Sequence, residues 1–339
     1  MLALSRKIRP VMLTLLTLLT GALMSVAHAQ DLSQITVTRL LDEPIITPAL
    51  DARMGSNIQG PSLIRVPEWI EDPLGAYYLY FSDHKGEYIR LAYADALTGP
   101  WTVYSPGTLQ LSASHFPETC PPCSVSEDSV VPAYAHIASP DVIVREDSQE
   151  LVMYVHGRDP MVQVTRLATS SDGIDFEGAP EILGRPYFRT FQYKDSWYGL
   201  AMPGFIYRSQ DGYTAFEEGP RFFNDEMRHS AVLVRGDTLY VFWTQVGHAP
   251  ESILLTAITM GDDWTAWSES ETVEVLRPER SWEGAGLPVI PSVRGDIIVP
   301  ANQLRDPAVF EEDGQVYLLY SVAGESGIAI ARVDGLPQI

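Results

Sequence analysis

The most regular feature of the chain is a pattern of apolar and polar stretches that recurs five times. Each copy opens with a small or polar tip and a short apolar stretch. A second stretch rich in Tyr, Leu and Val follows, and a polar hairpin leads to a third. Short apolar runs separated by turn residues are typical of β-strands. We predict the second strand of each copy at residues 77–81, 151–155, 197–201, 238–243 and 316–320.

The fifth copy ends before a fourth strand can form, and a candidate for that strand lies at the other end of the chain. Residues 35–41 alternate between apolar and polar side chains and then reach Asp42, Glu43 and Pro44. An N-terminal strand that completes the last unit would close a ring and remove exposed sheet edges. We predict an all-β, five-bladed β-propeller with four antiparallel strands per blade, built as a single domain from residues 30–339. A β-sandwich is the alternative.

Two of the repeated units are longer than the rest. The tips begin near residues 60, 138, 186, 228 and 304, so two intervals match the usual blade repeat of ~40–50 residues and two exceed it. The extra residues fall at about 105–137, which includes Cys120 and Cys123, and at about 268–303. Long loops in compact domains are more often functional than neutral. We expect the two cysteines to form a local disulfide without a catalytic role.

The first 29 residues read as a signal peptide. Arg6, Lys7 and Arg9 precede an apolar stretch, and Ala27-His28-Ala29 fits a small-x-small cleavage site. An uncleaved anchor is the alternative, but the apolar run is short for a membrane span and has no basic residues after it. We predict a secreted or periplasmic protein that is not inserted in a membrane after cleavage.

The charge of the chain narrows the class of ligand. The 339 residues include 23 Lys and Arg against 44 Asp and Glu, a formal net charge of −21, and removal of the three basic residues of the signal leaves −24. Nucleic acids and anionic membrane surfaces need basic patches, and none is visible. The charge suits a neutral or cationic ligand better than a polyanion, although a local cluster of Arg could still bind an acidic sugar.

Polar residues recur at the positions that a propeller brings to one face of its axis. The start of each first strand, the hairpin between the second and third strands, and the links between blades all lie at that face. Several acids, imidazoles and guanidinium groups fall there. We predict that seven of them hold a substrate: His84, His156, Arg189, Arg228, His229, Glu251 and Arg305.

Three carboxylates are candidates for catalysis. Asp141 and Asp306 each adjoin a proline ahead of an apolar strand, so we place both in the axial funnel. Glycosidic cleavage needs one carboxyl group that is protonated and one that is ionised. Glu283 follows Trp282, and desolvation beside an aromatic ring favours the acid form of a carboxyl. For Glu283, a surface carboxylate packed beside Trp282 is the alternative.

Histidine chemistry is a further option. An imidazole such as His229 at the axis could bind a metal ion, hold a water molecule or act as an acid. The alternative for His229 is a core histidine satisfied by a neighbour. No metal-ligand spacing is visible, so we expect no required cofactor, with a bound metal ion near His229 as an option.

At these residues the chain resembles the five-bladed propeller glycosidases, most of all glycoside hydrolase family 43. Leu304-Arg305-Asp306-Pro307 looks like the tip that carries the family's general base. Ser139-Pro140-Asp141 looks like the motif of its orienting carboxylate, and Arg228-His229-Ser230 is similar to the motif of its axial histidine. The motifs match when they are shifted by one blade. The tip that carries the family's acid has no Glu here, since it reads Pro186-Tyr187-Phe188.

The resemblance implies an exported glycoside hydrolase that acts on carbohydrate, with inversion at the sugar carbon. Asp306 would be the base, Asp141 the orienting carboxylate and Glu283 the acid, with Glu251 or His229 as other candidates for the acid. Two alternatives stay open. One is a glycan-binding propeller without chemistry. The other is a metal- or histidine-dependent lyase or hydrolase that uses His84, His156 and His229.

Overall fold

Residues 31–119, 134–159 and 162–337 are described by the structure, a computed structural model. Residues 31–339 belong to one compact unit. In the described ranges the chain forms strands and five short 3₁₀ turns, with no α-helix. No helix in the described part has the length and apolar character needed to cross a membrane. The expected signal peptide and Cys120 with Cys123 lie outside the described residues.

The strands make five antiparallel sheets, which are the five predicted blades. The first blade contains β2 (Gln59–Arg65), β3 (Tyr77–Ser82), β4 (Arg90–Ala94) and β5 (Thr102–Tyr104). The second contains β6 (Ile137–Arg145), β7 (Glu150–Asp159), β8 (Val162–Ser170) and β9 (Glu177–Gly178). The third contains β10 (Arg189–Tyr193), β11 (Ser196–Ala201), β12 (Phe205–Ser209) and β13 (Glu217–Arg221).

The fourth and fifth blades each depart slightly from this plan. The fourth contains β14 (Met227–Arg235), β15 (Thr238–Gln245), β16 (Ile253–Thr259) and two short outer segments, β17 (Ser268–Glu269) and β18 (Val273–Leu276), which both pair with β16. The fifth contains β19 (Arg305–Glu312), β20 (Gln315–Ser321), β21 (Ile328–Asp334) and β1 (Thr36–Arg39). Because β1 pairs with β21, the N-terminal strand completes the last blade, as predicted.

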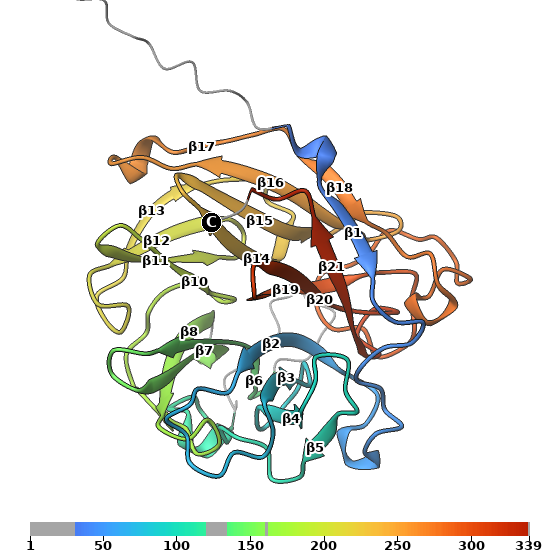
Figure 1. The fold of residues 1–339 in the computed structure, drawn as a ribbon, viewed down its shortest axis with the longest axis horizontal. Helices are drawn as coiled ribbons and strands as arrows, with labels where there is room; N and C mark the ends of the chain where they lie inside the picture. The colour runs from blue at the N-terminus through green and yellow to red at the C-terminus, as the bar shows by residue number, and fades with distance from the viewer. Residues whose placement is uncertain (1–30, 120–133, 160–161, 338–339) are drawn as a thin grey trace, which may run out of the picture. The chain divides into compact units, whose positions relative to one another are not determined.

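The blades form a closed ring around their innermost strands. β2 lies against β6 and β19, and β14 lies against β10 and β19, while β10 also contacts β6. Figure 1 shows these five strands gathered about the centre, with the outer strands of each blade at the rim. The five-bladed propeller is therefore confirmed, and the β-sandwich is excluded.

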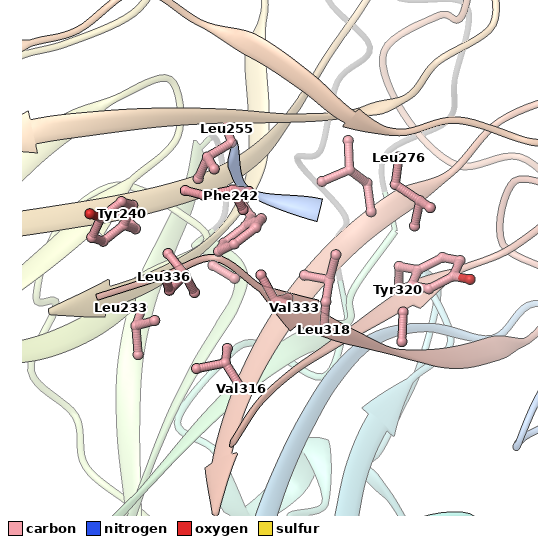
Figure 2. Close-up of a cluster of buried hydrophobic side chains, with 14 of the residues drawn as sticks. Leu233, Tyr240, Phe242, Leu255, Leu276, Val316, Leu318, Tyr320, Val333 and Leu336 are labelled. Atoms are coloured by element: carbon pink, nitrogen blue, oxygen red, sulfur yellow. The ribbon is translucent and has the colours of Figure 1, made fainter. Parts of the chain in front are cut away.

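Apolar side chains fill the spaces between neighbouring blades. Between the fourth and fifth blades, Tyr240, Phe242 and Leu255 belong to one buried cluster with Leu318 and Val333, which Figure 2 shows. Strands that are covered on both faces read as nearly continuous apolar runs, which is the pattern seen in the sequence. A fully buried residue of this kind contributes about 1.5–3 kcal/mol through its apolar area.

Four of the five innermost strands share a bulge near their first residues, and β10 does not. In β19 the register slips between Arg305 and Ala308, and β2, β6 and β14 have the same one-residue slip at the equivalent place. A bulge adds one residue to a strand and re-aims its side chain. The bulges lie at the end of the axis where the candidate chemistry was predicted.

Candidate functional site

Asp306 occupies the bulge of the fifth blade. Its backbone has φ 47°, in the left-handed region, and its side chain is 1% exposed. Asp is one of the few side chains that tolerates this conformation, which costs of order 1–3 kcal/mol for residues other than Gly. The bulge turns the carboxylate out of the strand ladder and toward the axis. The equivalent bulge residues of the first two blades, Gly60 and Ser139, also have positive φ but no charge.

His229, from the bulge of the fourth blade, is the nearest partner of Asp306. Its Nδ1 lies 2.7 Å from Asp306 Oδ1. Burial alone would raise the pKa of Asp306, but His229 and the nearby Arg228 guanidinium outweigh burial and hold that pKa below its usual value. Burial lowers the pKa of His229, although Asp306 opposes the shift. The lowered pKa favours the ionised form of Asp306, and its Oδ2 has no hydrogen-bond partner among the described residues.

Two more carboxylates lie beside this pair and alternate with arginines. Glu325 Oε1 is 2.9 Å from Arg305 Nη1. Glu251 lies between two arginines, with its oxygens 3.3 Å from Arg305 Nε and 3.5 Å from Arg228 Nε. The side chains of Glu325, Glu251 and Arg305 are all fully buried. Buried charges persist when each faces an opposite charge, and this row meets that condition.

His84 joins the row from the hairpin of the first blade. Its Nδ1 lies 3.3 Å from Glu325 Oε2, and Asn57 Nδ2 donates to the same oxygen at 2.7 Å. Burial would lower the pKa of His84, but Glu325, with smaller contributions from Asp306 and Asp296, outweighs it and raises the pKa above its usual value. His84 is thus the one axial imidazole whose protonated form is favoured. Burial works against the charge of Glu325, yet His84, Arg305 and Asn57 hold its pKa far below the usual range.

The other side of the site is a row of rings. His156 stacks on Tyr187 with ring centroids 4.0 Å apart, and Tyr187 reaches His229 at 5.0 Å. His136 meets His156 edge-on at 5.6 Å and Tyr134 at 5.2 Å. Tyr187 has φ 65°, which is rare for a bulky residue and inserts its ring between two imidazoles. Burial lowers the pKa of His136 to about 4 and that of His156 well below its usual value.

A long segment crosses the mouth of the site. We call residues 286–301, which belong to the second predicted insertion, the strap. Alternate carbonyls of the strap accept hydrogen bonds from axial side chains: Val293 from Arg228 (3.0 Å), Gly295 from Arg305 (3.2 Å) and Ile297 from Asn57 (3.2 Å). Asp296 pairs with Lys85 of the first blade at 2.9 Å. The strap thus links the fourth, fifth and first blades over the axial residues.

Two cavities flank these elements. One of about 470 Å³ opens beside the strap and is lined by Asn57, Lys85, Asp296 and Ile298, among others. The other, of about 840 Å³, is lined by the far ends of β2 and β6, with Leu63, Trp69, Val142 and Phe310. No axial carboxylate lines the larger one, so its size does not make it the candidate site. The smaller cavity shares Asn57 with the axial residues.

The described residues contain no set of side chains arranged as the ligands of a metal ion. No group of three or more His, Cys, Asp or Glu side chains among them is arranged to hold a metal ion. His229 contacts a single carboxylate and an aromatic ring, which does not fit the ligand number of a protein metal site. The described residues around His229 therefore offer no such ligand set, and a metal ion near His229 stays a prediction.

Comparison with known proteins places the chain in a family. No protein-family model matches the sequence. The uncharacterized protein R118 of Acanthamoeba polyphaga mimivirus is 38% identical over 304 residues, which cover 82% of this chain and 83% of that protein. The chain belongs to the R118 family. No activity is attached to R118 by its name, so the family relationship by itself leaves the function open.

Solved structures show what fold the R118 family shares. An exo-1,5-α-L-arabinanase from a bovine ruminal metagenomic library has a TM-score of 0.52 and 12% identity, and covers 82% of this chain and 94% of that chain. A thermostable family-43 glycoside hydrolase has a TM-score of 0.53 and 14% identity, with 82% and 89% covered. A GH130 structure has a TM-score of 0.56 and 13% identity, with 87% and 93% covered. The R118-family chain therefore has the fold of five-bladed propeller glycoside hydrolases, which confirms the resemblance.

Asp141 lies elsewhere than predicted. It comes after the bulge of the second blade, opposite Tyr154, and is equivalent to Ala308 rather than to Asp306. Its Oδ2 accepts hydrogen bonds from the backbone N–H and hydroxyl of Thr190 at 2.8 and 2.9 Å. Asp141 thus ties the second blade to the third. We predicted both aspartates in the axial funnel, but the structure does not bring Asp141 to the bulge that carries Asp306, because the two lie on opposite sides of their prolines.

Glu283 is also away from the axial row. It lies in a 3₁₀ turn (Ser281–Glu283) and is fully buried. Both of its oxygens are held: by Arg39 at 2.8 Å, by the Tyr320 hydroxyl at 3.0 Å, and by the backbone N–H groups of Glu279 and Arg280. Since Arg39 lies on β1, the outer strand of the fifth blade, these contacts fasten the long insertion to that strand. The structure does not bring Glu283 to the axial row, because its side chain is held by β1, by β20 and by its own turn, and its role as the acid stays a prediction.

The structure brings the remaining predicted site residues together, with one exception. Asp306, His84, His156, Arg228, His229, Glu251 and Arg305 gather at the axis, although their roles stay predictions. Arg189 is the exception. Its guanidinium donates to the carbonyls of Ser230 (2.9 Å) and Pro140 (3.0 Å), so it joins the inner strands of three blades. We therefore assign Arg189 to the wall of the site.

Sequence reasoning left three members of the site without a role. Glu325 follows β20 in the same kind of hairpin as His84, so its position in the repeat was the available signal. Tyr187 precedes β10, where the tip lacks the expected Glu, and a large ring takes that place. His136 comes at the end of an insertion, outside the repeat, so no signal in the sequence marked it.

Proposed function

We propose that this R118-family protein is a glycoside hydrolase whose substrate binds at the axial site. The observation that carries the proposal is the buried carboxylate of Asp306, which lies in the bulge of β19, 2.7 Å from His229 Nδ1 and beside two further buried carboxylates. An ionised carboxylate with a free oxygen can take a proton from water, which is the role of the base in glycoside hydrolysis. The propeller hydrolases with the same fold act on carbohydrates, as their names state.

We assign the role of acid to His84. The leaving oxygen of a glycoside needs a proton, and Glu325 favours the protonated form of this imidazole. Glu283 is bound elsewhere, and His229 is biased by burial toward its neutral form. In this arrangement Asp306 activates water at one face of the sugar ring and His84 protonates the leaving oxygen. Direct attack by water from the face opposite the leaving group inverts the configuration of the sugar carbon.

We also propose that the protein is exported, with residues 1–29 as a signal peptide. The product would be secreted or periplasmic. Sequencing the amino terminus of the protein from its native host tests this proposal. A mature terminus at Gln30 is expected, and a terminus at Met1 would contradict it.

Replacement of Asp306 by Asn tests the central assignment. The amide keeps the shape of the side chain but cannot take a proton, so turnover should fall by about 10²–10⁴-fold. The measurement is product release from a panel of arabinan, galactan, xylan and mannan oligosaccharides, with thermal unfolding as a check on folding. NMR of the first-formed product reports whether the sugar carbon is inverted.

Asp141→Asn is the matched control, because Asp141 ties the second blade to the third through Thr190 and Arg189 and makes no hydrogen bond or ion pair with Asp306. It should lower the unfolding temperature and leave the turnover of the folded enzyme unchanged. Unchanged turnover in Asp306→Asn would overturn the assignment. Sugar binding without any product, in the wild type as in the variant, would favour a glycan-binding propeller.

A further inference from the structure

The larger cavity, of about 840 Å³, lies at the ends of β2 and β6 that are away from their bulges. Sites for small molecules are concave, mostly apolar and roughly 300–1,000 Å³ in volume. No member of the axial row lines this cavity, so a ligand bound there is separate from the chemistry proposed above. Apolar side chains from three blades make up most of its lining, among them Leu63, Val66, Trp69, Val142, Val144 and Phe310.

The charged side chains at this cavity differ in whether they have partners. Arg65 is the one cation among the described residues that line it. Its guanidinium pairs with Glu312 at 2.6 Å and donates to the Tyr77 hydroxyl at 3.2 Å. Glu68 and Glu146 are exposed, and neither carboxylate has an ion pair or a hydrogen bond among the described residues. The cavity therefore offers a ligand two unpaired carboxylates, from neighbouring blades, and no unpaired cation.

Trp69 gives a second reason to expect a cation. Its ring packs against the apolar cluster between the first and second blades and also lines the cavity. It directly follows Glu68 in the chain. The face of an indole attracts an organic cation, and the attraction strengthens when the cation is desolvated. A ligand with an apolar body and an ammonium group would therefore find a complement for each of its two parts.

Other classes of ligand fit this lining less well. An anion would meet two carboxylates and no free cation, on a chain whose formal net charge is −21. A sugar would bring several hydroxyls, and hydroxyls that are buried without partners are costly. Among the described residues that line the cavity, Gln149 is the one amide or hydroxyl side chain. Charge and polarity together thus favour an amine over an acid or a polyol.

We propose that this cavity is a binding site for a small amphiphilic amine. The ammonium group lies beside Glu68, Trp69 and Glu146, and the apolar body lies against the walls formed by β2 and β6. The site distinguishes an amine from neutral and acidic compounds of the same shape by its charge. The proposal does not depend on the hydrolase activity, because the cavity shares no residue with the axial row.

Calorimetric titration of the wild-type protein with three compounds of similar shape tests the proposal. Phenylbutylamine, phenylbutanol and phenylbutyrate carry a positive charge, no charge and a negative charge. We expect the amine to bind about tenfold more tightly than the alcohol, and the acid to bind more weakly than the alcohol. The advantage of the amine should shrink at high salt, because exposed charges are screened. Equal binding of amine and alcohol, or no binding of the amine at millimolar concentration, overturns the proposal.

Two variants show whether the amine binds at this cavity. The double variant Glu68→Gln/Glu146→Gln keeps the size of both side chains and removes both charges. Its affinity for the amine should fall by up to about tenfold, to that for the alcohol. Glu87→Gln is the matched control, because it removes an exposed carboxylate from the smaller cavity, and amine binding should not change. An amine advantage that persists in the double variant, or that is lost in Glu87→Gln, would overturn the proposal.

Trp69→Leu tests the aromatic contact. Affinity for the amine should fall by about threefold or more, and affinity for the alcohol should fall by less. Thermal unfolding checks that the variant is folded, and the double variant decides the matter if it is not. An equal loss for both compounds, or no loss, would contradict the position of the ammonium group beside Trp69.

The amine site and the hydrolase assignment fail separately. If the amine binds through Glu68 and Glu146 but no glycan is cleaved, the amine site stands and the hydrolase assignment fails. If glycans are cleaved and the amine binds no better than the alcohol, the hydrolase assignment stands and the amine site fails.

Discussion

Asp306 and Tyr187 show how single residues build the site. Both have positive φ, at 47° and 65°, and both side chains reach the axis. Such conformations persist only where the surroundings enforce them, and they cluster at functional sites. In each case the unusual backbone directs the side chain toward the axis and away from the direction that a regular strand would give it. The axial site gains a carboxylate from Asp306 and an aromatic ring from Tyr187 in this way.

The opposite pKa shifts of Asp306 and His84 predict a bell-shaped pH profile. The base must be ionised, so kcat/KM should fall only as the pH drops through the lowered pKa of Asp306, below its ordinary value of about 3.9. The acid must be protonated, so kcat/KM should fall again as the pH rises through the raised pKa of His84, above about 6.5. Initial rates across the pH range check both limbs.

His84→Gln tests the assignment of the basic limb. It should lower kcat by about 10²–10⁴-fold and flatten the fall in rate at high pH. A basic limb that persists in His84→Gln would assign it to another group. Thermal unfolding of the variant at each pH separates a lost proton donor from a lost fold.

At this scale the sequence predicted residue types better than residue positions. The Arg-Asp-Pro tip identified Asp306, because its spacing before an apolar strand matches the family motif. The same reasoning misplaced Asp141. A shift of two residues around a bulge reverses the role of a side chain from axial to interblade, and the bulge leaves no mark in the pattern of apolar residues.

The strap is the element whose role the sequence disclosed least. It was marked only as part of a long insertion, since a segment outside the repeat has no register to read. In the structure its carbonyls occupy donors of Arg228, Arg305 and Asn57, and the axial residues beneath it are almost completely buried. The strap therefore covers the axial residues on the side of Arg228, Arg305 and Asn57. Its outer side carries exposed Leu287, Val289, Ile290, Val293, Ile298 and Val299.

Loss of the Asp296–Lys85 pair should loosen the strap. Lys85 is about half exposed, so the pair contributes no more than the roughly 0.2–1 kcal/mol of a surface ion pair. In Asp296→Asn, amide hydrogen exchange of residues 292–298 should accelerate by up to about fivefold. Lys194→Gln, which removes a pair with Asp262 on another part of the surface, is the control and should leave this exchange unchanged. Equal exchange in both variants would show that the Asp296–Lys85 pair does not hold the strap.

Glu283 should prove to be a structural residue. Glu283→Gln leaves Arg39 without its buried partner, which costs about 3–5 kcal/mol, and should lower the urea midpoint without changing the turnover of folded enzyme. Glu279→Gln is the matched control, because Glu279 pairs with the same arginine but is 59% exposed, so the cost should stay below about 1 kcal/mol. A loss of turnover in stable Glu283→Gln protein would instead support Glu283 as the catalytic acid.

The architecture of the whole molecule was the most predictable level. Five copies of one pattern over-determine a ring, so small errors at strand ends do not alter the result. The N-terminal strand could be predicted because the fifth copy lacked a fourth strand and residues 35–41 belonged to no copy. The site was less predictable, because it depends on how four separate bulges and the strap meet. The repeated sequence pattern predicts the strands of each blade but not the contacts between blades.

Removal of β1 should open the ring. Deletion of residues 31–40 exposes the edge of β21 and leaves Glu283 without Arg39, so the unfolding temperature should fall by roughly 10 °C or more. The bare edge should also promote association, which light scattering would detect. A protein that lacks only residues 1–30 is the control, and we expect it to behave as an intact propeller. Equal stability of the two proteins would contradict closure by β1.

The pairing of β1 with β21 also determines which blade can fold last during synthesis. Residues 36–39 leave the ribosome early and their partners, residues 328–334, leave it late. The first four blades are made of neighbouring segments and can assemble as they emerge, whereas the last one waits for both ends of the polypeptide to meet. Nascent chains therefore pass through a state in which four blades have folded and β1 is not yet paired with β21. Chaperones would have the most exposed sheet edge to protect at that stage.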